Sequence, residues 1–140
     1  MKNILVPIGS SENAVNTLQY AIDFAEVVNA NVFVFRAFSI AARAGAIINV
    51  DDIVAREQMA DVNDVVAKVD RKNTNIKIIS AKGGVVDSIE NVDKELGIDL
   101  IIVGPRPNDL QESYFLGKTT GSIVKQTDIS VLIIPEGYTF

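Results

Sequence analysis

The stretch LIIVGPRP, residues 100–107, predicts a buried β-strand that ends at Gly104 and continues into a loop. The stretch GKTTGS, residues 117–122, predicts the start of a helix, and VLIIP, residues 131–135, predicts a second buried strand closed by a proline. In a parallel α/β sheet, a loop that joins the carboxyl end of a strand to a helix N-terminus is suited to bind phosphate, because free backbone N–H groups point there.

The same alternation of apolar runs and helical stripes extends over the whole chain. Strands are predicted at residues 2–7, 32–35, 76–79, 100–103 and 131–134. Residues 36–51 fit either a helical extension or a loop over the sheet edge, and Gly97 is the predicted C-cap of the third helix. Right-handed crossovers then predict a parallel sheet with helices on both faces. The inward helical positions are Ala14, Leu18, Ala21, Ala25 and Val28, then Ala55, Met59, Val62, Val66 and Val69, then Val85, Ile89, Val92 and Leu96.

The amino-acid composition argues against several classes of function. The chain has 140 residues, 48% of them apolar, and a net charge of −5, which predicts one globular domain and argues against nucleic-acid binding. No apolar run is long enough to span a bilayer, so we expect no membrane partner and a cytoplasmic location. The absence of Cys and His removes thiolate nucleophiles, imidazole bases and Cys or His metal sites.

Several polar residues allow both a binding role and a structural one. Ser10 or Ser11 could contact phosphate or cap the first helix, with Glu12 in its first turn. The pair Asp51-Asp52 could hold a metal, but acids at a helix start more often interact with the helix dipole. Arg106 could clamp a phosphate or be a surface charge.

The chain resembles a universal stress protein domain over almost its whole length. The fold of that family implies an open five-stranded parallel α/β sheet of strand order 3-2-1-4-5, Rossmann-like and similar to the adenine nucleotide alpha hydrolases. Residues 1–140 then form one domain, either a complete protein or one half of a tandem pair. The resemblance is carried by residues 2–7, Ser11-Glu12, Gly83, residues 99–104, Gly117 and residues 131–135.

The resemblance also implies a pocket for ATP or AMP at the carboxyl ends of strands one and four. The sequence departs from the nucleotide-binding pattern at three places: Gly9 replaces an Asp, Pro107 replaces a Gly, and Lys118 replaces a Ser or Thr. Proline has no N–H to donate and a fixed φ, so it does not reproduce that glycine. The candidate binding residues are Pro7, Ile8, Gly9, Ser10, Phe35, Val103, Gly104, Arg106, Gly117, Lys118, Thr119 and Thr120.

The functional expectation is a stress-response module without enzymatic activity. Many members of the family dimerise through their last strands, and here residues 131–134 are expected to pair with a second copy or a tandem domain, through Val131, Leu132, Ile133 and Ile134. The alternative is that the tail at residues 138–140 covers this strand. Two other functions stay open: a slow ATPase that uses the loop from Gly104 to Gly117, and a relative of the electron-transfer flavoproteins.

Overall fold

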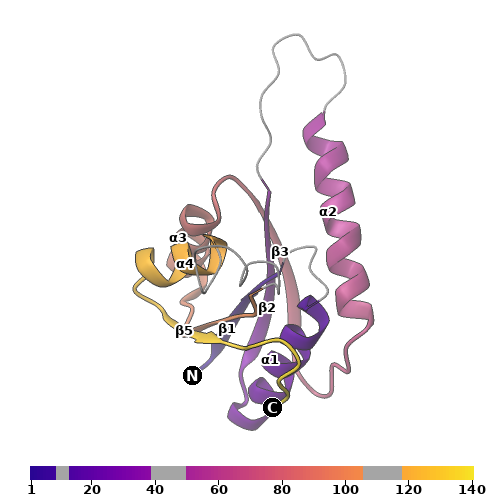
Figure 1. Ribbon diagram of the computed structural model, residues 1–140, viewed down its shortest axis with the longest axis vertical. Coiled ribbons are helices and arrows are strands. Elements are labelled where there is room, and N and C mark those ends of the chain that lie inside the picture. The colour runs from indigo at the N-terminus through magenta and orange to yellow at the C-terminus, as the bar shows by residue number, and fades with distance from the viewer. Residues whose placement is uncertain (9–12, 39–49, 106–117) are drawn as a thin grey trace.

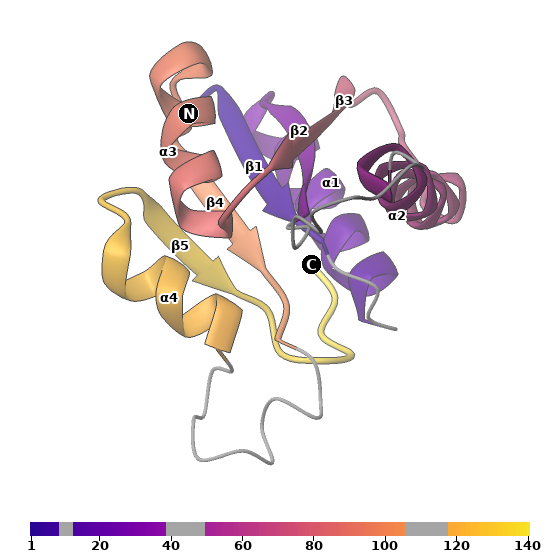
Figure 2. The ribbon, with the colours of Figure 1, turned by 90° about the horizontal axis from the view of Figure 1, so that it is seen from above.

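Parallel strands form one sheet in the order β3-β2-β1-β4-β5, as predicted (Figures 1 and 2). The computed structural model describes residues 1–8, 13–38, 50–105 and 118–140. The strands are β1 (Asn3–Pro7), β2 (Asn31–Phe38), β3 (Ile76–Lys82), β4 (Leu100–Val103) and β5 (Ser130–Ile133). The helices between them are α1 (Ala14–Val28), α2 (Val50–Ala67), α3 (Val85–Leu96) and α4 (Lys118–Gln126).

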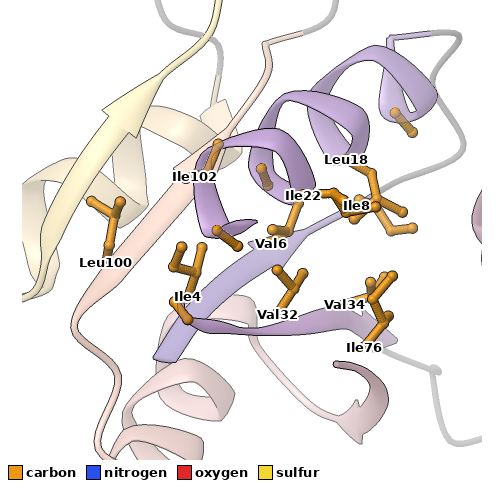
Figure 3. Packing of buried hydrophobic residues seen from close by; sticks show 14 of the residues in the cluster. Ile4, Val6, Ile8, Leu18, Ile22, Val32, Val34, Ile76, Leu100 and Ile102 are labelled. Atoms are coloured by element: carbon orange, nitrogen blue, oxygen red, sulfur yellow. The ribbon is translucent and has the colours of Figure 1, made fainter. Parts of the chain in front are cut away.

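The sheet has an apolar core on each face, because successive side chains of a strand point to opposite sides. Ile4 and Val6 pack with α1 and α2, whereas Leu5 between them packs with α3 and α4. Figure 2 shows the two helical layers on either side of the sheet, and Figure 3 shows the apolar side chains between α1 and the strands. Burial on both faces explains why the central strands β1 and β4 are short apolar runs in the sequence, whereas the outer strand β3 is interrupted by lysines.

Side-chain amides and one carboxylate fix the register at the amino edge of the sheet. Asn3 Nδ2 donates to the carbonyls of Leu96 and Gly97, and Asn31 Nδ2 donates to Asn3 Oδ1 at 3.1 Å. Asp99 Oδ2 accepts from the backbone N–H groups of Lys2 and Asn3 at 2.8 and 3.0 Å. These bonds join the starts of β1, β2 and β4.

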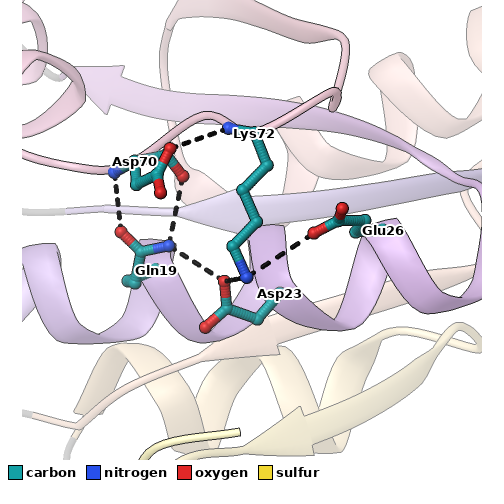
Figure 4. Close-up of polar contacts among 5 residues, drawn as sticks. All are labelled: Gln19, Asp23, Glu26, Asp70 and Lys72. Atoms are coloured by element: carbon teal, nitrogen blue, oxygen red, sulfur yellow. Dashed lines mark hydrogen bonds and ion pairs between the residues drawn. The ribbon is translucent and has the colours of Figure 1, made fainter.

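A polar network ties the turn between α2 and β3 to α1 (Figure 4). Lys72 Nζ lies 2.9 Å from Asp23 Oδ1 and 3.5 Å from Glu26 Oε2. Gln19 accepts from the backbone N–H of Asp70 at 2.8 Å and donates to its carbonyl. The hydrogen bond to Asp23 raises the pKa of the Lys72 ammonium.

Most predicted positions are confirmed, and the differences have structural causes. β2 continues to Phe38 because it pairs with β3 as far as Lys82, a partner that the sequence pattern does not reveal. β5 begins one residue earlier than predicted, at Ser130. Leu96 is 39% exposed rather than inward, because it is the last residue of α3 before Gly97 ends the helix with φ 68°.

The start of α1 also differs from the prediction. The helix begins at Ala14, so its first turn contains no acidic residue, and Asn13 is the N-cap. Ser10, Ser11 and Glu12 lie outside the described residues. Asp51-Asp52 do fall at the start of α2, which begins at Val50.

The C-terminal segment packs on α1. The ring of Phe140 meets Tyr20 and Phe24 edge-on, with centroids 5.5 and 5.8 Å apart. Asn16 Nδ2 donates to the Tyr138 carbonyl at 3.1 Å. The tail therefore follows the helix, as Figure 2 also shows, and these contacts leave β5 as the outer strand of the sheet.

Candidate functional site

The carboxyl ends of β1, β2 and β4 lie side by side. Pro7 is in register with Phe35, and the Ile8 N–H donates to the Phe35 carbonyl at 2.9 Å. Leu5 is in register with Ile101, which places Val103 and Gly104 at the same edge. The strand order reverses between β1 and β4, and this is the position at which open α/β sheets bind ligands.

Three predicted site residues contribute their backbone rather than their side chain to this edge. The side chains of Ile8, Phe35 and Val103 are 7%, 1% and 4% exposed and belong to the two apolar cores. Sequence reasoning placed these residues correctly at the edge, but their side chains stabilise the fold.

Gly104 lies against the first turn of α1. A Cβ on residue 104 would overlap the Thr17 hydroxyl and lie 2.9 Å from Asn13 Nδ2. Asn13 Nδ2 also donates to the Pro105 carbonyl at 3.3 Å, and the Thr17 hydroxyl donates to the Asn13 carbonyl at 3.0 Å. The glycine therefore permits a close approach between the end of β4 and α1.

Arg36 is a further polar residue at this edge. Val32 and Val34 point to the α1 face, so the alternation places Arg36 on that face as well. Its Nη1 donates to the Ile8 carbonyl at 3.3 Å, and the side chain is partly buried. Sequence reasoning missed Arg36, Asn13 and Thr17 as residues of this edge. The available signal concerned Arg36, a positively charged residue directly after the predicted strand at residues 32–35.

Three further candidates, Lys118, Thr119 and Thr120, form the first turn of α4. This helix begins at Lys118, in agreement with the predicted helical segment, and it returns the chain from the end of β4 to the start of β5. Thr120 is 7% exposed in its first turn. Gly9, Ser10, Arg106 and Gly117 lie outside the described residues, and the side chains of Lys118 and Thr119 are not described either.

The described residues at this edge supply groups that suit the binding of a ligand. The edge combines backbone groups at the ends of three strands with the Arg36 cation. Within the described residues, no three His, Cys, Asp or Glu side chains are grouped to hold a metal ion.

Among the same residues, no helix is long and apolar enough to cross a membrane.

A parallel sheet of order β3-β2-β1-β4-β5, with helices on both faces and a reversal point between β1 and β4, defines the class of open Rossmann-like α/β folds. The sequence profile described as the universal stress protein family matches residues 1–135. The chain belongs to this family. No curated protein matches the sequence significantly.

Solved structures named as universal stress proteins share the fold. UspA from Lactobacillus plantarum is 24% identical, with 95% of this chain and 97% of that chain covered and a TM-score of 0.74. A universal stress protein from Archaeoglobus fulgidus, solved in complex with dAMP, is 17% identical, with 96% and 98% covered and a TM-score of 0.65. A universal stress protein solved in complex with cAMP is 18% identical, with 96% of each chain covered and a TM-score of 0.67.

Proposed function

We propose that this protein is a regulatory module of the stress response that binds an adenine nucleotide, ATP or AMP, at the carboxyl ends of β1 and β4. The observation that carries the proposal is the position of Gly104, which ends β4 at the reversal point of the sheet and lies against α1. The similar structures in complex with cAMP and dAMP support an adenine ligand. Residues 1–140 as one domain and a cytoplasmic location remain predictions.

The binding residues that we propose are those at this edge. The backbone of Pro7, Ile8 and Gly104 would contact the nucleoside, and the segment from Gly117 to Thr120 would contact the phosphates. Free N–H groups at the start of α4 suit an anion, and Lys118 adds a positive charge. Arg106 and Ser10 complete the proposed set.

Calorimetric titration with AMP and ATP, with and without magnesium, tests this proposal. We expect binding that is lost in Gly117→Val and retained in Gly121→Ala. The Gly121 control is suitable because a Cβ at that position meets no atom within 4 Å. Absence of binding at millimolar nucleotide would contradict the proposal.

We propose that the module is not an enzyme. The chain has no Cys or His, and among the described residues no three acids are grouped to hold a metal ion, which supports binding without hydrolysis. The alternative, a slow ATPase, predicts phosphate release above a buffer blank that disappears in Lys118→Ala. Such release would overturn the non-enzymatic assignment without affecting the binding proposal.

We also propose that two copies pair through β5. The outer strand β5 has the sequence SVLI and carries no charge, whereas the opposite outer strand, β3, carries Lys77 and Lys82. Charged side chains, lysine above all, protect an exposed strand edge from pairing, so β5 is the less protected edge. The contacts of the tail with α1 support a free β5 edge.

A further inference from the structure

Arg36 is held at the carboxyl edge of the sheet by two features of the fold. It follows Phe35, which pairs with the last residue of β1, so Arg36 extends just past the end of that strand. Its Nη1 donates to the Ile8 carbonyl at 3.3 Å, which directs the side chain from β2 across to β1. The guanidinium is therefore placed at the edge where we propose the ligand binds.

Most of the donor capacity of this guanidinium is not used by the described protein atoms. A guanidinium has five N–H donors, and one of them bonds the Ile8 carbonyl. Both ion pairs among the described side chains belong to Lys72, near the amino edge, and neither involves Arg36. With respect to the described residues, this partly buried guanidinium keeps donors that suit the bidentate binding of a phosphate or carboxylate.

The separation between Arg36 and Gly104 indicates the length of a ligand that would contact both residues. Arg36 lies on β2 and Gly104 follows β4, with β1 between them. Two strand spacings separate them, roughly 10 Å, which is comparable to the length of a mononucleotide. The phosphate that we assign to the start of α4 lies on the β4 side, so Arg36 faces the opposite end of the ligand.

We propose that Arg36 binds a second anionic group on the nucleoside end of the ligand, so that the site selects a nucleotide with a phosphate on its ribose over a simple mononucleotide. This inference rests on the proposed nucleotide function and specifies the class of ligand. The functional groups that carry it are the guanidinium, the Ile8 carbonyl that orients it, and the edge formed by β1 and β4.

Calorimetry with three probes tests the inference: AMP, adenosine 3′,5′-bisphosphate and inorganic pyrophosphate. We expect the wild type to bind the bisphosphate about 10-fold more tightly than AMP, in proportion to one additional charge-assisted contact. Arg36→Gln should abolish this preference. Lys72→Gln removes the same charge near the amino edge and should retain the preference.

Thermal unfolding of the Arg36→Gln variant shows whether a loss of binding comes from a loss of folding. If that variant is unfolded, Arg36→Lys is tested in its place. Arg36→Lys keeps the positive charge but loses the bidentate geometry, so it should retain part of the preference for the bisphosphate. Pyrophosphate binding that requires Arg36, with no binding of either nucleotide, would overturn the nucleotide function and leave the anion site standing. Equal affinities of wild type and the Arg36 variants for all three probes, or no binding of any probe to the wild type, would overturn the inference.

Discussion

Gly104 and Thr17 approach so closely that a Cβ on residue 104 would overlap the Thr17 hydroxyl. Gly104 directly follows β4, and Thr17 lies near the start of α1. The two residues are distant in the sequence and meet at the proposed binding edge. Thr17 is 2% exposed and its hydroxyl is bonded to the Asn13 carbonyl, so its side chain has little room to move away.

We therefore expect Gly104→Ala to lower the free energy of unfolding by about 1–3 kcal/mol, the usual cost of overpacking. Chemical denaturation provides the measurement. Gly121→Ala, in the interior of α4 with no atom within 4 Å of the added Cβ, should instead be neutral or stabilise by about 0.5–1 kcal/mol. Equal stability of wild type and Gly104→Ala would show that the close approach is not required.

The carboxyl group of Asp99 makes the free energy of unfolding depend on pH. Its bonds to the backbone N–H groups of Lys2 and Asn3 hold the pKa of the Asp99 carboxyl below its ordinary value of 3.8. Between the lowered pKa of the folded state and the ordinary pKa of the unfolded state, the folded state binds fewer protons than the unfolded state. The contribution of Asp99 to the free energy of unfolding is therefore complete above about pH 4 and is lost as the pH falls through the folded pKa.

Denaturation of wild type and Asp99→Asn between pH 7 and pH 2 measures this contribution. The variant should be less stable at neutral pH, and the difference should shrink in acid. Asp128→Asn is the control, because Asp128 is an exposed carboxylate without a hydrogen bond to the described residues. A stability difference that stays constant over the whole pH range would contradict the assignment.

The proposed pairing through β5 predicts a variant that separates association from folding. The Ile134 N–H donates to the Val103 carbonyl at 2.8 Å, so by alternation the N–H of Val131 points away from β4. Val131→Pro removes an outward donor and leaves the bonds to β4 intact. We expect wild type to sediment as a dimer and Val131→Pro to weaken the association at least tenfold.

Val131→Thr is the matched control, since it keeps the shape of the side chain and the backbone donor. It should sediment like the wild type. A monomeric wild type, or an unchanged dimer in Val131→Pro, would exclude pairing through this edge.

Much of the fold is predictable from the sequence because the central strands β1 and β4 are buried on both faces and some of the described turns have a local signal. Leu100–Val103 is apolar throughout, and Gly97 adopts the positive φ that its C-cap role requires. The extension of β2 to Phe38 was missed, since it depends on pairing with β3. The strand order came from the family resemblance.

The site is less predictable, because its contacts join distant parts of the chain. Asn13 and Pro105 are 92 residues apart, and no local pattern links them. Arg36 gains its place only when β2 lies beside β1. Phe35 shows the opposite case: its position at the edge was predicted, whereas its side chain is 1% exposed and packs in the core.

Backbone amide shift mapping during titration with AMP tests the central proposal most directly. We predict that the amides of Ile8, Gly104 and Thr120 shift together at the carboxyl edge, while those of Asn3, Asn31 and Asn75 at the amino edge stay unchanged. Shifts concentrated at the amino edge, or no shifts at millimolar AMP, would contradict the proposed site.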